Sequence, residues 1–150
     1  MSTADFGEDT YVAPSDDLTS SWWEATRTHR LLLQRCGHCG SVQWYPRPIC
    51  ISCGATTELG WVRADGRGIV DTFTVVHRAP RPGLPTPYVI ARVRLTEGPV
   101  MLSRLVDVEP DAVVCDLPVV VTWRDLADGR ALPVFRADES QGHGGADDER

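Results

Sequence analysis

Two CxxC pairs constrain the fold of this chain more than any other feature of its sequence. The first pair is Cys36 and Cys39, the second is Cys50 and Cys53, and ten residues separate the two pairs. Each CxxC turn brings two thiolates together, and two such turns that face each other complete the tetrahedral sulfur cage that zinc prefers. A closed site of this kind stabilises a fold and leaves no coordination position for catalysis. We therefore expect one structural zinc ion held by these four thiolates.

Two alternatives for the cysteines stay open from the sequence. Iron binds in the same four-sulfur geometry, because ligand softness and shape do not separate it from zinc. A pair of disulfides is the second alternative, although this spacing strains a local bridge and the sequence shows no secretory signal. His38 lies between the first two cysteines, and we leave it out of the site because the four-cysteine set is already complete.

The residues around the cysteines predict a rubredoxin-like ribbon. Residues 31–34 lead into the first pair as a short strand, and residues 42–45 leave it as the antiparallel partner. Gly37, Gly40 and Gly54 stand where a knuckle needs unusual backbone angles, which other residues adopt at a cost. The pattern predicts a hairpin that carries a metal site at its tip.

The distribution of charge predicts how the 150 residues are divided. Residues 1–24 carry six acids and no base, and residues 137–150 carry five acids and one arginine. We expect an acidic tail at 1–17, a helix with the zinc ribbon at 18–66, a barrel at 67–137 and a disordered acidic tail at 138–150. Residues 25–136 have fourteen arginines against ten acids. This mild positive charge suits a small polyanion, such as a phosphorylated cofactor, at least as well as a long nucleic acid.

The sequence offers little to support catalysis. It has no lysine, which excludes Schiff-base and pyridoxal chemistry, and it has neither a Walker loop nor a dinucleotide fingerprint. Its four histidines are dispersed and belong to no nucleophile motif. Cys115 lies in an apolar run, with no adjacent histidine or basic residue to lower its pKa, so we expect a buried, inert thiol.

The sequence also lacks the marks of a membrane or secreted protein. No apolar run approaches the roughly twenty residues that a membrane span requires. The N-terminus has no basic segment followed by a hydrophobic one. Together with thiols that need reducing conditions, these features lead us to expect a cytoplasmic protein without a membrane partner.

Residues 16–30 read as one helix that precedes the ribbon. Ser21 and Glu24 have the spacing of a capping box, and Asp17 or Thr19 are alternative caps. Trp22 and Trp23 are adjacent, so they point about 100° apart around a helix and do not both enter one small core. We expect one of them to pack on the ribbon or barrel and the other to contact a partner, unless a loop covers both.

After the ribbon, the period of the sequence changes to two. Runs rich in β-branched residues, separated by turn signals at Glu97-Gly98 and Asp128-Gly129, predict strands at 68–77, 88–95, 100–108, 119–124 and 132–136. Five short strands of this kind suit a small Greek-key barrel of the OB type. The predicted fold class is therefore mainly β, with an N-terminal helix, a four-cysteine zinc ribbon and a five-stranded OB-fold barrel.

The order of these motifs resembles a known family. The segments "LLLQRCGHCG", "YPRPICISCG", "GRGIVDTFTVVHRAP", "PYVIARVRLTEG" and "LPVF" follow a helix with tryptophans, as in the zinc-ribbon OB-fold family known as domain of unknown function thirty-five. The resemblance covers about residues 18–137, and the ordered combination is far more specific than any single piece. The sequence departs from the family at 116–118, where Asp116 stands in place of an expected glycine.

The resemblance implies an accessory subunit of acyl-CoA and lipid metabolism rather than an enzyme. Family members are partners of thiolase-fold enzymes, including thiolases and the lipid-transfer-protein-like aldolases of steroid side-chain degradation, and some accompany hot-dog-fold enoyl-CoA hydratases. They are thought to dock through the helix and ribbon, and to help hold or hand over acyl-CoA. The resemblance transfers no catalytic residue, and it carries over only the four cysteines, as metal ligands.

Several residues near the second knuckle are candidate contacts for acyl-CoA or for a partner. Arg47, Arg63 and Arg67 flank this knuckle and the start of the barrel, where they could meet the phosphates of CoA. Tyr45 and Trp61 could cover a flat adenine or a partner surface, as could the tryptophans of the helix. Each of these residues has an equally ordinary role in packing or in a solvated surface.

Two rival functions are weaker. Nucleic-acid binding is supported by Arg92 and Arg94 on one strand face, but stacking aromatic residues are scarce and the acidic tails would compete with phosphates. An independent thioester enzyme would need an acid or a base, for which His77 with Asp71 is only a weak candidate.

Overall fold

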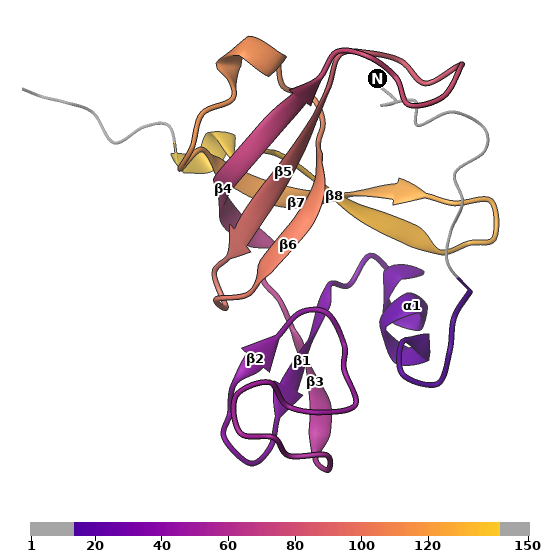
Figure 1. The fold of residues 1–150 in the computed structure, drawn as a ribbon, viewed down its shortest axis with the longest axis vertical. Helices are drawn as coiled ribbons and strands as arrows, with labels where there is room; N and C mark the ends of the chain where they lie inside the picture. Colours follow the sequence, from indigo (N-terminus) through magenta and orange to yellow (C-terminus); the bar gives the residue numbers. More distant parts are fainter. Residues whose placement is uncertain (1–13, 142–150) are drawn as a thin grey trace, which may run out of the picture.

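The four-cysteine part of the chain is a three-stranded antiparallel sheet. In the computed structural model, which describes residues 14–141, the strand order is β2-β1-β3 (Figure 1). The strands are β1 (Leu32–Cys36), β2 (Val42–Gln43) and β3 (Leu59–Arg63). The β1–β2 hairpin was expected, whereas β3 was not. Its five residues include a glycine and do not alternate between buried and exposed, so only pairing with β1 reveals the strand.

The rest of the chain closes into a five-stranded barrel in the order β4-β5-β6-β8-β7. All five predicted strands are present, with ends shifted by up to three residues: β4 (Arg67–Val76), β5 (Tyr88–Leu95), β6 (Val100–Leu105), β7 (Pro118–Asp125) and β8 (Ala131–Ala137). Every pair is antiparallel except β6 with β8, which meet in parallel at Leu105 and Phe135. This closed topology confirms the predicted OB-type barrel and the mainly β fold class.

Alternation along β5 shows how the barrel core is built. Val89, Ala91, Val93 and Leu95 point inward and are at most 2% exposed, while Arg92 and Arg94 between them are exposed. They pack with Phe135, which is fully buried. Burial of apolar area of this kind is the main source of stability for a small barrel.

The helix α1 (Ser20–Thr26) is much shorter than the predicted helix at 16–30. Its N-cap residue is Thr19, and the predicted capping box at Ser21 is not used. Before the helix, the Asp16 carboxylate accepts hydrogen bonds from the backbone N–H of Thr19 at 2.8 Å and from its hydroxyl at 2.6 Å, and this turn sets where α1 starts. After the helix, His29 has a φ of +54°, which a continuing helix does not allow.

Side-chain contacts fasten this helical segment to the barrel. The Thr26 hydroxyl accepts a hydrogen bond from the Ala131 amide at 3.2 Å, and Arg27 donates to the Asp128 carbonyl at 2.8 Å. His29 lies 2.6 Å from the Asp125 carboxylate and stacks on Trp123. The helix therefore lies against the β7–β8 hairpin on one side and the ribbon sheet on the other (Figure 1).

The connection between β6 and β7 corrects one expectation. Cys115 is exposed rather than buried, because the apolar run before it forms no strand and only Val113 enters the core, after the short 3-10 helix η1 (Pro110–Ala112). Asp116 has a φ of +65°, the left-handed region that favours glycine. This conformation explains why the family pattern has glycine there.

The ends of the chain are described only in part. Most of the predicted acidic tails at 1–17 and 138–150 lies outside the described residues. Within them, the 3-10 helix η2 (Glu139–Gln141) follows β8 at the start of the predicted acidic tail. No helix within residues 14–141 combines the length and the apolar character needed to cross a bilayer.

Candidate functional site

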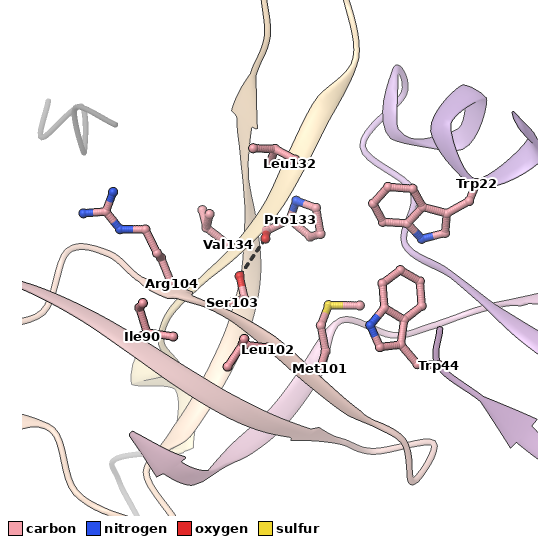
Figure 2. Close-up of a pocket in the computed structure, with 10 residues that line it drawn as sticks. All are labelled: Trp22, Trp44, Ile90, Met101, Leu102, Ser103, Arg104, Leu132, Pro133 and Val134. Atoms are coloured by element: carbon pink, nitrogen blue, oxygen red, sulfur yellow. Dashed lines mark hydrogen bonds between the residues drawn. The ribbon is translucent and has the colours of Figure 1, made fainter. Parts of the chain in front are cut away.

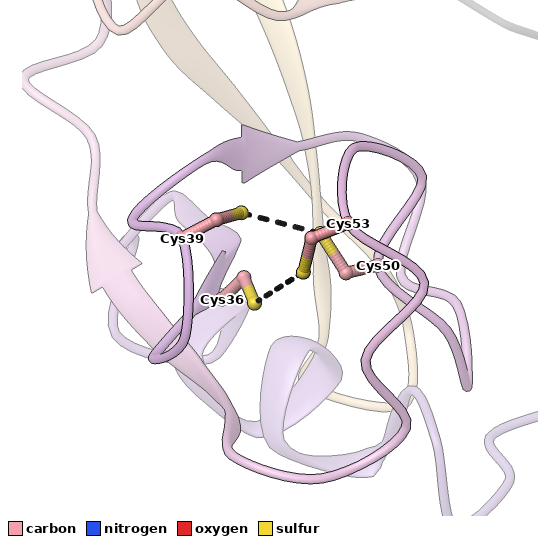
Figure 3. A group of neighbouring side chains, drawn as sticks. All are labelled: Cys36, Cys39, Cys50 and Cys53. Atoms are coloured by element: carbon pink, nitrogen blue, oxygen red, sulfur yellow. Dashed lines mark hydrogen bonds between the residues drawn. The ribbon is translucent and has the colours of Figure 1, made fainter.

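The four cysteines of the two CxxC pairs converge at the tip of the ribbon (Figure 3). Their sulfur atoms all lie within 4.8 Å of one another, and the Cys36–Cys53 and Cys39–Cys50 sulfur pairs are each 3.7 Å apart. A tetrahedral site with metal–sulfur bonds of about 2.3 Å has sulfurs about 3.8 Å apart, so the cluster fits a single ion. No disulfide joins the five cysteines, and the 3.7 Å between paired sulfurs is far longer than the roughly 2.05 Å of an S–S bond, which speaks against the disulfide alternative.

The two knuckles repeat one backbone pattern. In the first, the Gly40 amide donates to the Cys36 carbonyl at 2.9 Å, and in the second the Gly54 amide donates to the Cys50 carbonyl at the same distance. Both glycines have a left-handed φ, of +74° and +76°, as the sequence predicted. Gly37 does not share this conformation; there a side chain would approach Glu58 at 3.1 Å.

The surroundings of the cluster favour the thiolate at Cys39 and Cys50 and disfavour it at Cys53. The Ser41 hydroxyl lies 3.1 Å from the Cys39 sulfur and 3.3 Å from the Cys50 sulfur. Hydrogen bonding from Ser41 lowers the pKa of Cys39, and with nearby backbone amides it lowers the pKa of Cys50 to about 6. At Cys53 a backbone hydrogen bond at Ala55 lowers the pKa, but burial and the neighbouring thiols outweigh it and raise it to about 12. Four such close thiols ionise together only around a cation, whose charge replaces their protons.

A row of aromatic rings connects the helix to the second knuckle. Trp22 meets Trp23 at 4.6 Å between ring centroids and Trp44 at 5.2 Å, and Trp44 meets Tyr45 at 4.9 Å. The sequence had marked the other three rings but not Trp44, which read only as part of a strand. The signal that could have identified Trp44 was its neighbour Tyr45. Two adjacent aromatic residues beside a small metal knuckle tend to pack against other aromatic rings.

The structure separates the predicted contact residues into packed and exposed ones. Trp22 is 6% exposed, and Trp61 is half-buried against the hydrophobic core. Trp23 is also half-buried, with the Arg130 guanidinium 4.5 Å above its ring, so neither tryptophan of the helix is fully exposed. Arg67 forms an ion pair with Asp138 at 3.3 Å.

Of the remaining predicted contacts, Tyr45 and Arg47 precede the second knuckle, and Arg63 ends β3 where it pairs with Leu32. Tyr45 is 53% exposed, and Arg47 and Arg63 are exposed as well. Two apolar residues that the sequence analysis passed over, Ile49 and Ile51, are 44% and 63% exposed. We call Tyr45, Ile49 and Ile51 the knuckle patch. Large exposed apolar side chains are a common feature of protein contact sites.

An apolar groove runs between this end of the molecule and the barrel (Figure 2). Its volume is about 340 Å³, and Trp22 and Trp44 form one wall across from Met101. The far side is formed by β6 and β8, where the Ser103 hydroxyl donates to the Pro133 carbonyl at 2.8 Å. Within residues 14–141, the indole nitrogens of both tryptophans are buried without a hydrogen-bond acceptor.

The residues that suggested nucleic-acid binding form ion pairs with Asp71, the carboxylate that suggested an independent enzyme. The Asp71 carboxylate bonds to Arg94 and lies 3.7 Å from Arg92, so the two arginines face a carboxylate on the neighbouring strand. This pairing reduces the positive charge that a nucleic acid would meet. It also commits Asp71 to a salt bridge, while His77 lies beyond the end of β4.

Comparisons with known proteins agree with this architecture. Residues 23–59 match the family model described as "ChsH2, rubredoxin-like zinc ribbon domain", and residues 61–124 match "ChsH2, C-terminal OB-fold domain". A DUF35 domain-containing scaffold protein of Methanocaldococcus jannaschii is 32% identical over 117 residues, which cover 77% of this chain and 83% of the relative. The chain belongs to the DUF35 family. This membership confirms the resemblance drawn from the sequence.

Other relatives are longer than this chain. The chain is 39% identical to a probable enoyl-CoA hydratase alpha subunit of Thermomonospora curvata over 77% of its own length, but this match spans 36% of that protein. It is 36% identical to the 3-oxo-4,17-pregnadiene-20-carboxyl-CoA hydratase alpha subunit of Mycobacterium tuberculosis, over 83% of this chain and 40% of the relative.

Solved structures of the DUF35 family share the fold. A chain of the "Ltp2-ChsH2(DUF35) aldolase" is 36% identical and superposes with a TM-score of 0.76, over 84% of this chain and 98% of that one. A DUF35 protein of unknown function from Sulfolobus solfataricus, at 14% identity and a TM-score of 0.60, has the same fold.

Proposed function

We propose that the chain is a non-catalytic accessory subunit that binds a thiolase-fold enzyme and helps it to bind or transfer acyl-CoA. The observation that carries this proposal is the similarity to a DUF35 chain solved as part of an aldolase, which extends over 98% of that chain at 36% identity. The names of the hydratase relatives point to acyl-CoA chemistry and support a hydratase as a further partner; the family resemblance suggests that this hydratase has a hot-dog fold.

The proposed role of the metal is structural. One zinc ion bound by Cys36, Cys39, Cys50 and Cys53 would have all four positions filled by thiolates, and so it would hold the knuckles together without activating water or substrate. A zinc ribbon stabilised in this way presents a surface of fixed shape, which lowers the entropic cost of binding a partner.

The knuckle patch is the proposed contact with the enzyme. Tyr45, Ile49 and Ile51 are exposed on one short segment beside the metal cluster, and Arg47 lies between them in the sequence. Exposed aromatic and aliphatic side chains flanked by arginine have the composition of the energetic centre of an interface. Trp23, Arg63 and Arg67 would contribute from the rim of this surface.

The apolar groove is the proposed contact with the acyl group. Its walls of tryptophan, methionine and leucine suit a hydrocarbon, and its volume of about 340 Å³ lies in the range of small-ligand sites. Arg104 at one end of the groove supplies positive charge for the anionic part of CoA.

Co-purification tests the proposal. We expect the full chain to form a stable complex with a thiolase-fold enzyme from the same organism, detected by native mass spectrometry, and to show no turnover of acyl-CoA when alone. Ile51→Ser should weaken the complex at least about tenfold, as for a residue near an interface centre. Val114→Ser is the matched control, because Val114 is 56% exposed but lies away from the knuckle, after η1. Turnover by the isolated chain, or equal effects of the two substitutions, would contradict the proposal.

A further inference from the structure

Two buried glutamines face each other across the ribbon hairpin. Gln34 on β1 and Gln43 on β2 are directly paired in the antiparallel register, and they are 3% and 2% exposed. They are unusual in this position, because a buried amide without hydrogen bonds costs on the order of 1–3 kcal/mol. The hydrogen bonds that satisfy them therefore indicate what the two residues do.

The side chain of Gln43 binds the backbone on both sides of Cys50. Its amide nitrogen donates to the Ile49 carbonyl at 3.1 Å, and its amide oxygen accepts from the Ile51 N–H at 3.0 Å. The same nitrogen donates to the Gln34 amide oxygen at 2.6 Å. Because the backbone partners are one carbonyl and one N–H, only this orientation of the amide satisfies them both.

Gln34 binds the same segment at Arg47, three residues before Cys50. Its amide oxygen accepts from the Arg47 N–H at 2.9 Å, and its amide nitrogen donates to the Arg47 carbonyl at 3.0 Å. The two glutamines thus form one connected network that runs from the hairpin to residues 47–51. Buried polar networks of this kind rigidify a structure when every member is satisfied.

The network matters because residues 44–53 form no strand in the part of the chain that the structure describes. Ladder hydrogen bonds fix the first knuckle, since Cys36 ends β1 and pairs with Leu59 on β3. The second knuckle has no such ladder, and the amide of Gln43 lies where a neighbouring strand would otherwise hold the backbone around Cys50.

We propose that Gln43, supported by Gln34, is a positioning residue for the metal centre. It holds the backbone of Cys50 so that this thiolate faces the other three whether or not the metal is bound. The proposal rests on the zinc site proposed above. Residues that orient metal ligands through hydrogen bonds matter for binding, because removing them commonly lowers metal affinity by roughly 10–100-fold.

The rate of zinc release tests the role of Gln43. Gln43→Met keeps the length of the side chain but removes its donor and acceptor, and we expect zinc transfer to a chromogenic chelator to accelerate at least about tenfold. Val62→Ala, on β3 of the same sheet, is the control for a general loss of stability, and we expect it to change release less than about threefold at a similar drop in melting temperature. Equal acceleration by both substitutions would overturn the proposal.

Hydrogen exchange on the wild-type chain gives a second measurement if Gln43→Met does not fold. After the metal is stripped, we expect the Ile51 and Arg47 amides to stay protected, because their acceptors are glutamine oxygens. Loss of this protection together with the metal would mean that the metal positions the segment, which overturns the proposal. Metal analysis of the untreated protein separates this result from failure of the zinc site itself, which would be seen as an absence of bound ion in the wild type.

Discussion

Trp22 packs against Trp44 with 5.2 Å between the ring centroids and an angle of 44° between the planes. The contact joins the helix α1 to the segment that leads into the second knuckle. Because both rings also line the apolar groove, one pair of side chains connects the helix, the ribbon and the barrel (Figure 2). Stability and the proposed acyl contact therefore depend on the same two residues.

Removing the buried ring should destabilise the protein strongly. Trp22→Ala deletes a side chain that is 6% exposed, and we expect the free energy of unfolding to fall by about 3–5 kcal/mol. Urea unfolding followed by circular dichroism measures the change. Tyr45→Ala is the control, since a ring that is 53% exposed should change stability by less than about 0.5 kcal/mol. A small effect of Trp22→Ala would show that the ring is not part of the core.

Metal content should depend on the four clustered cysteines and not on the fifth. We expect one zinc ion per chain by elemental analysis, its loss in Cys50→Ser, and its retention in Cys115→Ser, because Cys115 is exposed and far along the chain. Acid should release the ion, since protons compete with it for the thiolates. Freshly purified protein without stoichiometric zinc or iron would refute the assignment, and iron alone would change the identity of the ion.

Asp128 should contribute to stability at neutral pH but not in acid. Its carboxylate accepts from the Arg130 amide at 2.9 Å and from the guanidinium at 2.7 Å, and these contacts lower its pKa below 3.8. A group whose pKa is lower in the folded state stabilises above the unfolded value, and this contribution is lost as the pH falls through the folded value. Asp128→Asn should therefore lower the melting temperature at pH 7, and this effect should shrink in acid as the pH falls below 3.8. An equal effect at neutral pH and in acid would contradict this origin.

The ion pairs of Asp71 should keep the barrel from binding nucleic acid. At physiological salt we expect a fluorescent single-stranded oligonucleotide to bind the wild type no more tightly than about 10⁻⁴ M, the weak end of non-specific affinity. Asp71→Asn, which leaves Arg92 and Arg94 without their carboxylate, should bind more tightly and with a steeper salt dependence. Micromolar binding by the wild type would favour the nucleic-acid alternative over the proposed accessory role.

Local signals allowed much of the fold to be predicted. The CxxC pairs, the glycines at 40 and 54 and the period-two runs each depend on residues close together in the sequence, and the knuckles and barrel strands followed from them. The helix was overestimated because its end depends on the backbone conformation of His29 and on contacts of the preceding turn with the barrel hairpin. The strand β3 was missed because it is defined by its pairing with β1.

In the candidate site, too, some features were predictable from the sequence and others were not. Sequence spacing by itself determined the four cysteines, the chemistry they offer and the family, because a metal cage made of two short turns is encoded locally. Only the tertiary structure decided which residues are buried and which are available. It placed Trp22 inside, exposed Ile51 and Cys115, paired Asp71 with two arginines, and turned Gln43 toward the backbone of Cys50. Burial and hydrogen bonding between distant residues depend on how the sheets and the helix pack, and no short stretch of sequence contains that information.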